Sequence, residues 1–509
     1  MDSAVDRLLS LARSRPERPL LLTHGRSYTC EGFARRAGTL AATLAAAGVR
    51  RGDRVATLLE EYDNFFVAMF AAWLAGAVLV PLNKSLPEPD VAWLLAKSQP
   101  RVLLTEDDAP ADAGAIDADG AIGADEPTDA PAYADGPMRL RAVAAELAEQ
   151  PLPSGATAVA PGELAMIMFT SGTTGVPKGV CHTLRAIGGN AARVADLLGL
   201  GTDDRIFINT PPYFTSGICH FLTLMVNGGS TVGRRGFFFG DALLAELAET
   251  GCTGFGGAPA HLVRVVEPLG DQVQTSSLRF WVSSGDHLGL DTIARLHRVL
   301  PNVRLFNMYG LTEVAGRLCV LAPDDLERRS GSVGRPLADM TVTVRDPDGA
   351  PVPDGDEGEL YVEGPLLMQH YLDEPTVTAA ALTAQGLRTG DFGRRDADGF
   401  LWIAGRKDDI IKRGGEKVSI VHIQEALRAL GKFSDVAVIA ADDPILGHVP
   451  VAFVVSADGL PVKRTAVMRE LRALLPATSL PSRIVPLEQI PRTGSGKAVR
   501  AELLRLAGA

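Results

Sequence analysis

The chain has 509 residues, which is enough for about three domains of average size. Hydrophobic residues make up 46% of it and charged residues 22%, a globular composition that excludes a largely disordered or a collagen-like chain. The formal net charge of −11 argues against a basic binding surface, so no nucleic-acid partner is expected.

The cysteines and the N-terminus both favour a cytoplasmic location. The five cysteines are widely spaced and form no Cys-x-x-Cys pair: Cys30, Cys181, Cys219, Cys252 and Cys319. This pattern predicts free thiols in a reducing compartment rather than a disulfide framework or a zinc site. The first residues lack the basic and apolar segments of a secretion signal.

One apolar run has the length either of a membrane span or of a buried helix followed by a strand. It covers residues 65–82, which are 18 uncharged residues in succession. Because Gly76 and Pro81 interrupt it, we predict a buried helix that stops at Gly76 and a buried strand over 77–80. No stable membrane insertion is expected.

The acidity of the chain is concentrated in residues 106–136. This segment holds ten acidic residues and no Lys or Arg, and without them the formal charge would be −1. We predict a solvated, mobile surface insertion, with an acidic docking segment as the alternative.

Short apolar strands alternate with helical patterns in the N-terminal part of the chain. Examples are strands predicted over 54–59 and 279–283 and a helix over 290–300. This alternation predicts parallel sheets covered by helices. Turns near 346–349, followed by an alternating segment over 359–363, predict a smaller antiparallel region.

The pattern changes at the charged turn 405–409, which separates predicted strands at 400–404 and 410–411. Four further elements are expected beyond it: helices over 422–430 and 464–475 and strands over 436–440 and 451–455. The predicted organisation therefore has three parts: a large domain over 1–404, a hinge over 405–409 and a small α+β domain over 410–509.

The strongest chemical signal follows a predicted strand over 164–169. It reads FTSGTTGVPKGV from Phe169 to Val180. Its glycines allow a ligand to approach the backbone closely, and its hydroxyls, amides and Lys178 suit phosphate oxygens. Since Gly179 follows Lys178 where Ser or Thr is required, this is not a Walker A loop.

Six segments in order along nearly the whole chain resemble the motifs of the adenylate-forming superfamily, which includes acyl-CoA synthetases, adenylation domains and luciferases. The first is the segment just described. The others are YGLTE at 309–313, RTGD at 388–391, GRKD at 405–408, GGEKVS at 414–419 and PRTGSGK at 491–497. On these motifs the chain is identified as a member of that superfamily.

The resemblance implies both a fold and an activity. The fold is α/β, with a large N-terminal domain of mainly parallel sheets sandwiched by helices, a β-subdomain and a small mobile α+β C-terminal domain. The activity joins a carboxylic acid to the α-phosphate of ATP, releases pyrophosphate and transfers the acyl group to a thiol. The implied cofactors are ATP, Mg²⁺ and CoA. Two anions meet in the first step, so catalysis needs positive charge and fixed donors.

Catalytic roles follow from the same resemblance. Lys497 would bridge the carboxylate and the phosphate, Thr312 would donate to the α-phosphate, and Glu313 would be the metal ligand. For the thiol step the small domain would swing about Asp408 and present Gly414, Gly415 and Ser419 to the pantetheine arm.

The nucleotide site is implied in the same way, with adenine on Tyr309 and the ribose on Asp391 and Arg406. The full set is Thr170, Ser171, Gly172, Thr173, Thr174, Gly175, Lys178, Asn307, Met308, Tyr309, Gly310, Asp391 and Arg406.

The acid is expected to bind among three segments. Their residues are Tyr213, Phe214, Ser216, Gly217, Ser283, Ser284, Gly285, Ala315 and Gly316. No Asp or Glu occurs over 211–221, where amino-acid-activating domains place an acid, so an α-amino acid is not expected. Tyr213 and Phe214 favour an aryl or apolar acid. The histidines near these segments lack metal spacing and are interpreted as structural: His220, His261, His287 and His297.

Two departures from the superfamily pattern leave the thiol acceptor open. Residues 420–424 lack a proline and two acids, and residues 477–481 lack a Tyr-Lys pair. CoA is the expected acceptor, and the alternative is an enzyme that loads the phosphopantetheine of an acyl carrier protein. A third interpretation, a non-catalytic nucleotide-binding scaffold, is disfavoured by Lys497 and Glu313. A monomer or a homodimer is expected.

Overall fold

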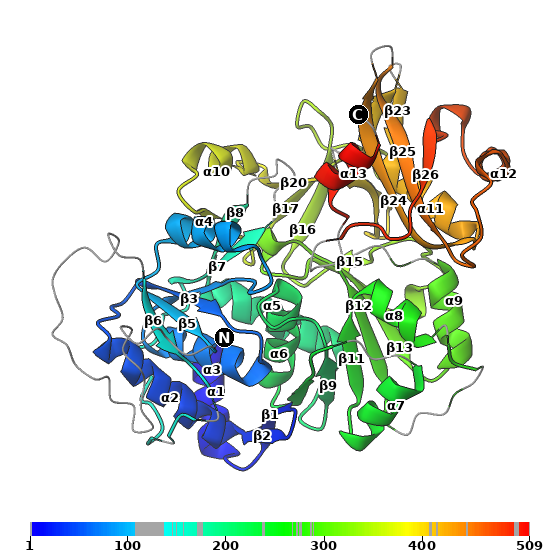
Figure 1. Ribbon diagram of the computed structural model, residues 1–509. Helices are drawn as coiled ribbons and strands as arrows, with labels where there is room; N and C mark the ends of the chain where they lie inside the picture. The colour runs from blue at the N-terminus through cyan, green and yellow to red at the C-terminus, as the bar shows by residue number, and fades with distance from the viewer. Residues whose placement is uncertain are drawn as a thin grey trace. The chain divides into compact units, whose positions relative to one another are not determined.

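The structure is a computed structural model in which the chain forms two compact units, Met1–Thr341 with Glu363–Leu387, and Val342–Val362 with Arg388–Ala509 (Figure 1). The residues that it describes are 3–106, 137–144, 146–148, 150–155, 157–170, 177–236, 240–266, 268–270, 273, 277–285, 288, 290–406, 410–413, 416–443, 446–492 and 498–507.

The first unit contains a nine-stranded sheet in the order β15-β14-β13-β12-β11-β9-β10-β1-β2. Its strands are β1 Pro19–Thr23, β2 Arg26–Thr29, β9 Arg205–Ile208, β10 Ser230–Gly233, β11 Gly254–Gly257, β12 Phe280–Ser284, β13 Arg304–Tyr309, β14 Cys319–Leu321 and β15 Arg335–Pro336. Along the sheet, the six successive strands β13, β12, β11, β9, β10 and β1 are parallel to their neighbours, as the alternating pattern predicts. Strands β2, β14 and β15 add antiparallel edges.

A second sheet of seven strands has the order β18-β8-β7-β4-β3-β5-β6. Its strands are β3 Arg54–Leu58, β4 Val78–Pro81, β5 Val102–Thr105, β6 Met138–Arg141, β7 Leu164–Thr170, β8 Lys178–Thr183 and β18 His370–Tyr371. Strands β3 to β7 are parallel, and β8 turns back antiparallel to β7.

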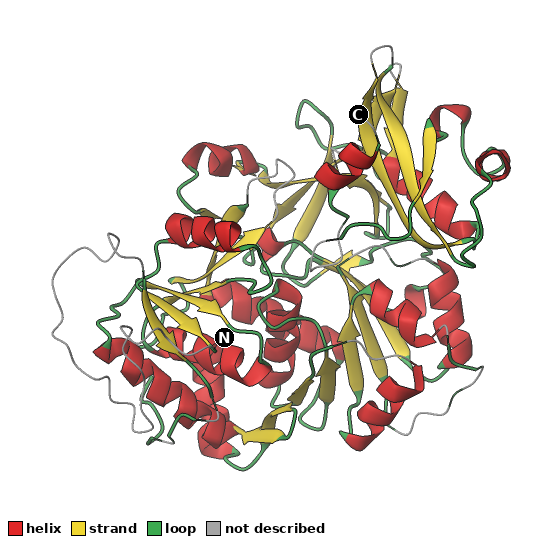
Figure 2. Cartoon of the chain, in the orientation of Figure 1, coloured by secondary structure: helices red, strands yellow, loops and turns green. Residues whose placement is uncertain are grey.

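Helices fill the layer between the two sheets and cover their outer faces (Figure 2). The helices of this unit are α1 Ala4–Ser14, α2 Cys30–Ala46, α3 Tyr62–Leu74, α4 Glu88–Ser98, α5 Leu184–Leu198, α6 Thr215–Val226, α7 Gly240–Glu249, α8 Pro259–Val266, α9 Leu290–Val299 and α10 Pro375–Ala381. Helix α3 contacts strands of both sheets, α5 packs on the smaller sheet and α6 on the larger one. Helix α4 covers the other face of the smaller sheet, and α8 the other face of the larger one. This layering confirms the α/β class.

The apolar run over 65–82 is a core helix and a core strand, as predicted. Every residue of α3 is buried, and so is every residue of β4. Gly76 between them has a φ of +78°, and a Cβ there would lie 2.8 Å from the carbonyl oxygen of Thr157, so a side chain is excluded. Among the helices of the described residues, none is long and apolar enough to cross a membrane.

The prediction that the acidic insertion starts at Glu106 is wrong for that residue. The Glu106 carboxylate accepts hydrogen bonds from the backbone amides of Glu60 and Glu61 and from the side chain of Asn64, at 2.7–3.1 Å. These groups lie at the start of α3, where a helix has unpaired amides and favours an anion. Residues 107–136 lie outside the described part of the chain.

Two small sheets lie in the second unit, apart from the strand Leu382–Thr383, which belongs to the first unit. The first has the order β16-β17-β20-β19 with β21 on β20, and its strands are β16 Thr341–Arg345, β17 Glu357–Glu363, β19 Leu382–Thr383, β20 Gly386–Arg395 and β21 Leu401–Arg406. The pairings of β19 and of β21 with β20 are antiparallel, as predicted for the middle of the chain.

The other sheet has the order β23-β22-β25-β24 with β26 on β25, and its strands are β22 Ile410–Arg413, β23 Glu416–Ser419, β24 Phe433–Asp443, β25 Gly447–Ser456 and β26 Arg483–Pro486. Helices α11 Ile420–Ala429 and α12 Arg464–Leu471 pack on one face, and α13 Arg500–Leu506 packs on the other. The expected α+β pattern is therefore present, although α12 ends at Leu471 rather than at residue 475.

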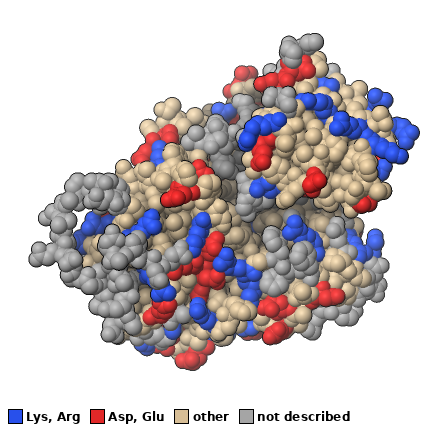
Figure 3. All heavy atoms as spheres, viewed as in Figure 1, with Lys and Arg blue, Asp and Glu red and all other residues tan. Residues whose placement is uncertain are grey.

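The compact second unit includes β16, β17, β20 and β21 in addition to the last hundred residues. The domain boundaries 1–404, 405–409 and 410–509 stay a prediction, and residues 407–409 of the expected hinge lie outside the described residues. On the face drawn in Figure 3, acidic and basic side chains are interspersed rather than gathered into one basic surface.

Candidate active site

Part of the residues predicted to bind the acid, together with Tyr309 of the predicted nucleotide site, lie at one edge of the nine-stranded sheet. Because β9, β12 and β13 are parallel, their carboxyl ends lie together. Tyr213 follows β9, Ser284 ends β12 and Tyr309 ends β13. The crevice outside the carboxyl ends is where open α/β sheets bind ligands, so the strand directions support the predicted location.

The two faces of β12 separate a pair of serines that the sequence analysis treated together. Ser283 is level with Gly257, where a Cβ would lie 3.1 Å from the His261 ring of α8. Two residues before Ser284, Val282 is level with Gly256, where a Cβ would lie 2.8 Å from the His220 ring of α6. Since side chains alternate along a strand, Ser284 faces α6 and Ser283 faces α8.

The loop after β13 is shaped by glycines. A Cβ at Gly310 would overlap the carbonyl oxygen of Gly316, and a Cβ at Gly316 would overlap the sulfur of Cys219. Gly316 has a φ of +124°, and Ala315 before it adopts a left-handed conformation. The loop closes with a backbone hydrogen bond of 2.9 Å from Leu318 N to Tyr309 O. It therefore holds the short 3₁₀ helix Thr312–Val314 beside the carboxyl edge.

The seven-stranded sheet fixes that 3₁₀ helix from the other side. His182 Nε2 on β8 donates to the carbonyl oxygen of Thr312 at 2.6 Å. Burial lowers the pKa of His182 to about 4, so the ring is neutral near pH 7. Asn190 on α5 donates to the carbonyl oxygens of Val314 and Arg317 at 3.2 and 2.7 Å. None of these contacts was predicted, because each joins residues more than a hundred positions apart.

Glu313 and Lys178 come together through Tyr371, a third residue that the sequence analysis missed. The Tyr371 hydroxyl donates to Glu313 Oε1 at 2.9 Å, and Lys178 Nζ lies 5.4 Å from the centre of the Tyr371 ring. Lys178 also opposes Thr170 across the β7–β8 pair. A carboxylate and a cation from the predicted phosphate site thus share one neighbour. Ser171, Gly172, Thr173, Thr174 and Gly175 lie outside the described residues.

The first turn of α6 carries another part of the predicted acid site. The rings of Tyr213 and Phe214 meet edge to face, 4.8 Å between centres. Gly217 is required there because a Cβ would lie 2.5 Å from the carbonyl oxygen of Pro211. Ser216 lies in the same turn, and burial raises the pKa of Tyr213. Apolar ring surface therefore flanks this end of the helix.

Arg317, in the loop between the 3₁₀ helix and β14, is a buried cation whose side chain reaches His220 of α6. Its side chain is 5% exposed, and its Nη2 lies 3.4 Å from His220 Nε2. Burial and, secondarily, the nearby Arg317 charge lower the pKa of His220 well below its usual range, so this histidine is neutral. The sequence offered one signal for Arg317, a single charge within the otherwise uncharged stretch 314–321.

In the second unit the structure joins two residues predicted for the ribose. Asp391 on β20 and Arg406 on β21 are directly opposed across the antiparallel pair, and Asp391 is 3% exposed. Ser419, predicted for the thiol channel, accepts from His422 N at 3.3 Å as the cap of α11 and donates to the carbonyl oxygen of Ala404 at 2.8 Å. Asp408, Gly414, Gly415 and Lys497 lie outside the described residues.

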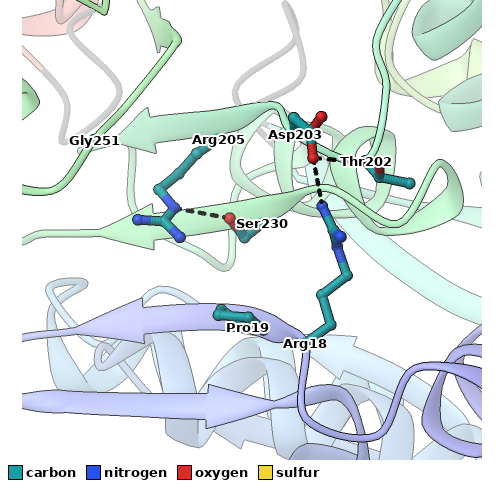
Figure 4. A pocket seen from close by; sticks show the side chains of 7 residues that line it. All are labelled: Arg18, Pro19, Thr202, Asp203, Arg205, Ser230 and Gly251. Carbon is teal, nitrogen blue, oxygen red and sulfur yellow. Dashed lines mark hydrogen bonds and ion pairs between the residues drawn. The ribbon is translucent and has the colours of Figure 1, made fainter.

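A hollow of about 300 Å³ lies at the opposite, amino edge of the nine-stranded sheet (Figure 4). It is lined by Arg18, Pro19, Thr202, Asp203, Arg205, Ser230 and Gly251. Its two arginines point to partners within the protein, Arg18 to Asp203 and Arg205 to Ser230 Oγ. None of the predicted site residues lines it, so the hollow does not mark the candidate site.

Comparison with known proteins decides the family. The model of the AMP-binding enzyme family matches residues 10–372, and that of the AMP-binding enzyme C-terminal domain matches residues 422–497. The chain belongs to the AMP-binding enzyme family. This confirms the superfamily identified from the six motifs, together with the predicted AMP-forming acid–thiol ligase that activates a non-amino carboxylic acid through an adenylate.

Three similar members of this family illustrate its range. Indoleacetate–CoA ligase of Aromatoleum aromaticum is 32% identical over 92% of this chain and 91% of its own. Sulfoacetate–CoA ligase of Cupriavidus necator is 31% identical over 96% and 95%. The structure of o-succinylbenzoate CoA synthetase from Bacillus subtilis, in complex with its acyl-adenylate intermediate, superposes with a TM-score of 0.85 at 25% identity over 98% and 97% of the two chains. That structural likeness confirms the predicted fold class.

Proposed function

We propose that this enzyme uses ATP and Mg²⁺ to adenylate a carboxylic acid with an aromatic or apolar body and then transfers the acyl group to CoA. The observation that carries the proposal is the arrangement of Glu313, Tyr371 and Lys178 beside a 3₁₀ helix that is anchored from both sheets. It provides a fixed carboxylate and a fixed cation where the phosphates of ATP would meet the acid.

Glu313 suits Mg²⁺ by its chemistry. Its Oε1 is held by Tyr371, while Oε2 has no hydrogen-bond partner in the described part of the chain. One protein carboxylate together with phosphate oxygens is a common way for enzymes to hold Mg²⁺. The ion would neutralise charge on the phosphates when bound.

The chain's own residues would supply the remaining steps. Lys178 would hold phosphate oxygens near β8, and Thr312 would donate to the α-phosphate. Lys497, carried by the small domain, would bridge the acid and the phosphate in the first step. Withdrawal of that domain about Asp408 would then expose the adenylate to the thiol. The three-part organisation over 1–404, 405–409 and 410–509 belongs to this proposal.

CoA is the favoured thiol because the relatives reported above are named as CoA ligases or synthetases. The unusual residues after Ser419 do not disturb the helix expected there, since Ser419 caps α11. The proline that commonly follows is therefore dispensable for the local fold.

Acid-dependent exchange of pyrophosphate into ATP tests the adenylation step, over a panel of aryl, fatty and short-chain acids. We expect exchange with one class of acid, its loss in Lys497→Ala, and CoA-stimulated release of AMP. Failure of every acid in the panel would contradict adenylation. Exchange that leads to acyl transfer only onto a holo-carrier protein would contradict CoA as the acceptor.

A further inference from the structure

Arg317 is a buried charge with no opposite charge against it among the residues that the structure describes. In the part of the chain that the structure describes, no carboxylate forms an ion pair with it, and its nearest side-chain partner is His220. His220 is neutral, and burial raises the pKa of the Cys219 thiol beside it, so this neighbour is uncharged too. Burying an ion without a counter-charge is costly, and proteins pair such ions or use them to bind ligands.

The guanidinium is not needed to hold its own loop. The loop is fixed at Arg317 by its main chain, whose carbonyl oxygen accepts from Asn190 at 2.7 Å and whose amide donates to Asn190 Oδ1 at 3.3 Å. The side chain has five N–H donors, and one hydrogen bond, to His220 Nε2, is present. Donors thus remain for an anion.

The position of the guanidinium is set by α6 and β11. His220 stands five residues after Thr215, the first residue of α6, which places it roughly 7 Å along the helix from the carboxyl edge. Its ring occupies the space left by Gly256, on the face of the sheet that Ser284 shares. Arg317 therefore lies on the acid-binding face, farther into the protein than the first turn of α6 with Tyr213 and Phe214.

We propose that Arg317 binds a second anionic group, a carboxylate or a sulfonate, at the end of the substrate remote from the carboxylate that becomes adenylated. The guanidinium offers two parallel N–H donors that can meet two oxygens of a carboxylate or of a sulfonate. The same charge repels a substrate ammonium group, in keeping with the lack of acidic residues over 211–221. This role depends on the proposed function, because the other end of the same acid must reach Thr312.

Matched pairs of acids test the role of Arg317. The pairs are hexanoate with adipate, phenylacetate with 4-carboxyphenylacetate, and propionate with 3-sulfopropionate, each measured by pyrophosphate exchange. We expect the wild type to prefer the dianionic member of at least one pair. Arg317→Met should lower that preference about 10- to 100-fold, the usual size of a hydrogen bond to a charged group. Arg317→Lys should retain part of the preference for the dianionic acid, since the positive charge remains but the two parallel N–H donors of the guanidinium are lost.

Arg205→Met is the matched control, because it removes an arginine from the amino edge of the same sheet. Its preference among the acids should equal that of the wild type. The proposal would be overturned if Arg317→Met kept the wild-type preference for the dianionic acid. It would also be overturned if the wild type preferred the monoanionic member of every pair.

Thermal unfolding provides a readout that does not need turnover. Arg317→Met removes a buried charge that no described carboxylate pairs, so its Tm should equal or exceed that of the wild type, whereas removal of a structural cation would lower the Tm. Adipate, 4-carboxyphenylacetate or 3-sulfopropionate should raise the Tm of the wild type and not that of Arg317→Met. If no acid supports exchange, the proposed function fails, and these shifts in Tm alone decide whether Arg317 binds an anion.

Discussion

The two edges of the nine-stranded sheet treat buried polar groups in opposite ways. At the amino edge, Asp204 is buried and accepts from Gly201 N and Thr253 Oγ1, each at 2.8 Å, and from Arg279. At the carboxyl edge, no acidic side chain of the described residues pairs with Arg317. Asn209 Oδ1 is buried there, and no described residue donates a hydrogen bond to it.

This difference distinguishes buried polar groups that stabilise the fold from buried polar groups that are available to bind a ligand. Polar atoms that stabilise a protein are paired within it, because an unpaired buried group costs about 1–3 kcal/mol. The hollow at the amino edge is lined by arginines with partners, so it has little to offer a ligand. The carboxyl edge retains unpaired donors and acceptors and fits a binding site. Substitutions at the two edges should therefore affect different properties.

The largest effect is expected for Glu313→Gln. Loss of the carboxylate should lower pyrophosphate exchange by roughly 100-fold or more, the size seen when one electrostatic group is removed from a catalytic site. The Mg²⁺ concentration needed for half-maximal exchange should rise, and the Tm should not fall. Glu246→Gln, which removes a carboxylate from α7 that pairs with Arg234 and is not a predicted site residue, serves as the control with normal exchange. Normal exchange in Glu313→Gln would contradict the assigned role.

Acid should destabilise the protein through His182. Its pKa is about 4 in the folded protein and about 6.5 when unfolded, so the unfolded chain takes up a proton first as the pH falls. The contribution is fully present above pH 6.5 and is lost progressively toward pH 4, in total about 3 kcal/mol of unfolding free energy.

Urea denaturation at pH 7 and pH 5 measures the effect of His182. His182→Gln, which retains a donor toward Thr312, should show a smaller drop in unfolding free energy between the two pH values. An equal drop in the wild type and in the variant would contradict the role of His182.

At the amino edge, Asp204→Asn should lower stability without changing catalysis. The substitution weakens its hydrogen bonds to Gly201, Thr253 and Arg279, at a cost of about 2 kcal/mol. Urea denaturation measures that loss, and kcat/KM in the exchange assay should stay at the wild-type value. A change in acid selectivity would show that the two edges are coupled.

The smallest effect is expected for Tyr371→Phe. It removes one hydrogen bond to Glu313 Oε1, worth about 1 kcal/mol, and so should weaken Mg²⁺-dependent exchange about fivefold. Thr378→Val, which alters a contact to the backbone of Tyr371 and leaves its hydroxyl in place, is the matched control. An unchanged Mg²⁺ dependence in Tyr371→Phe would mean that Glu313 is held adequately without it.

The sequence by itself determined the family and the α/β class, and it predicted most elements of the candidate site. These features depend on short segments of the sequence. Examples are the motif YGLTE at 309–313 and the apolar run interrupted at Gly76. Asp391 and Arg406 are opposed in the β20–β21 pair, and their assignment to the ribose stays a prediction.

Only the tertiary structure decided which side chains support those motifs. Tyr371 meets Glu313 across 58 residues, His182 meets Thr312 across 130, and Arg317 meets His220 across 97. The alternation of side chains along β12 places Ser283 and Ser284 on opposite faces of the sheet. Glu106 binds the amides at the start of α3 and is not part of a solvated acidic insertion. The physical reason is the same in each case. Burial and hydrogen-bond partners are set by segments distant in the chain, and no spacing within one segment encodes them.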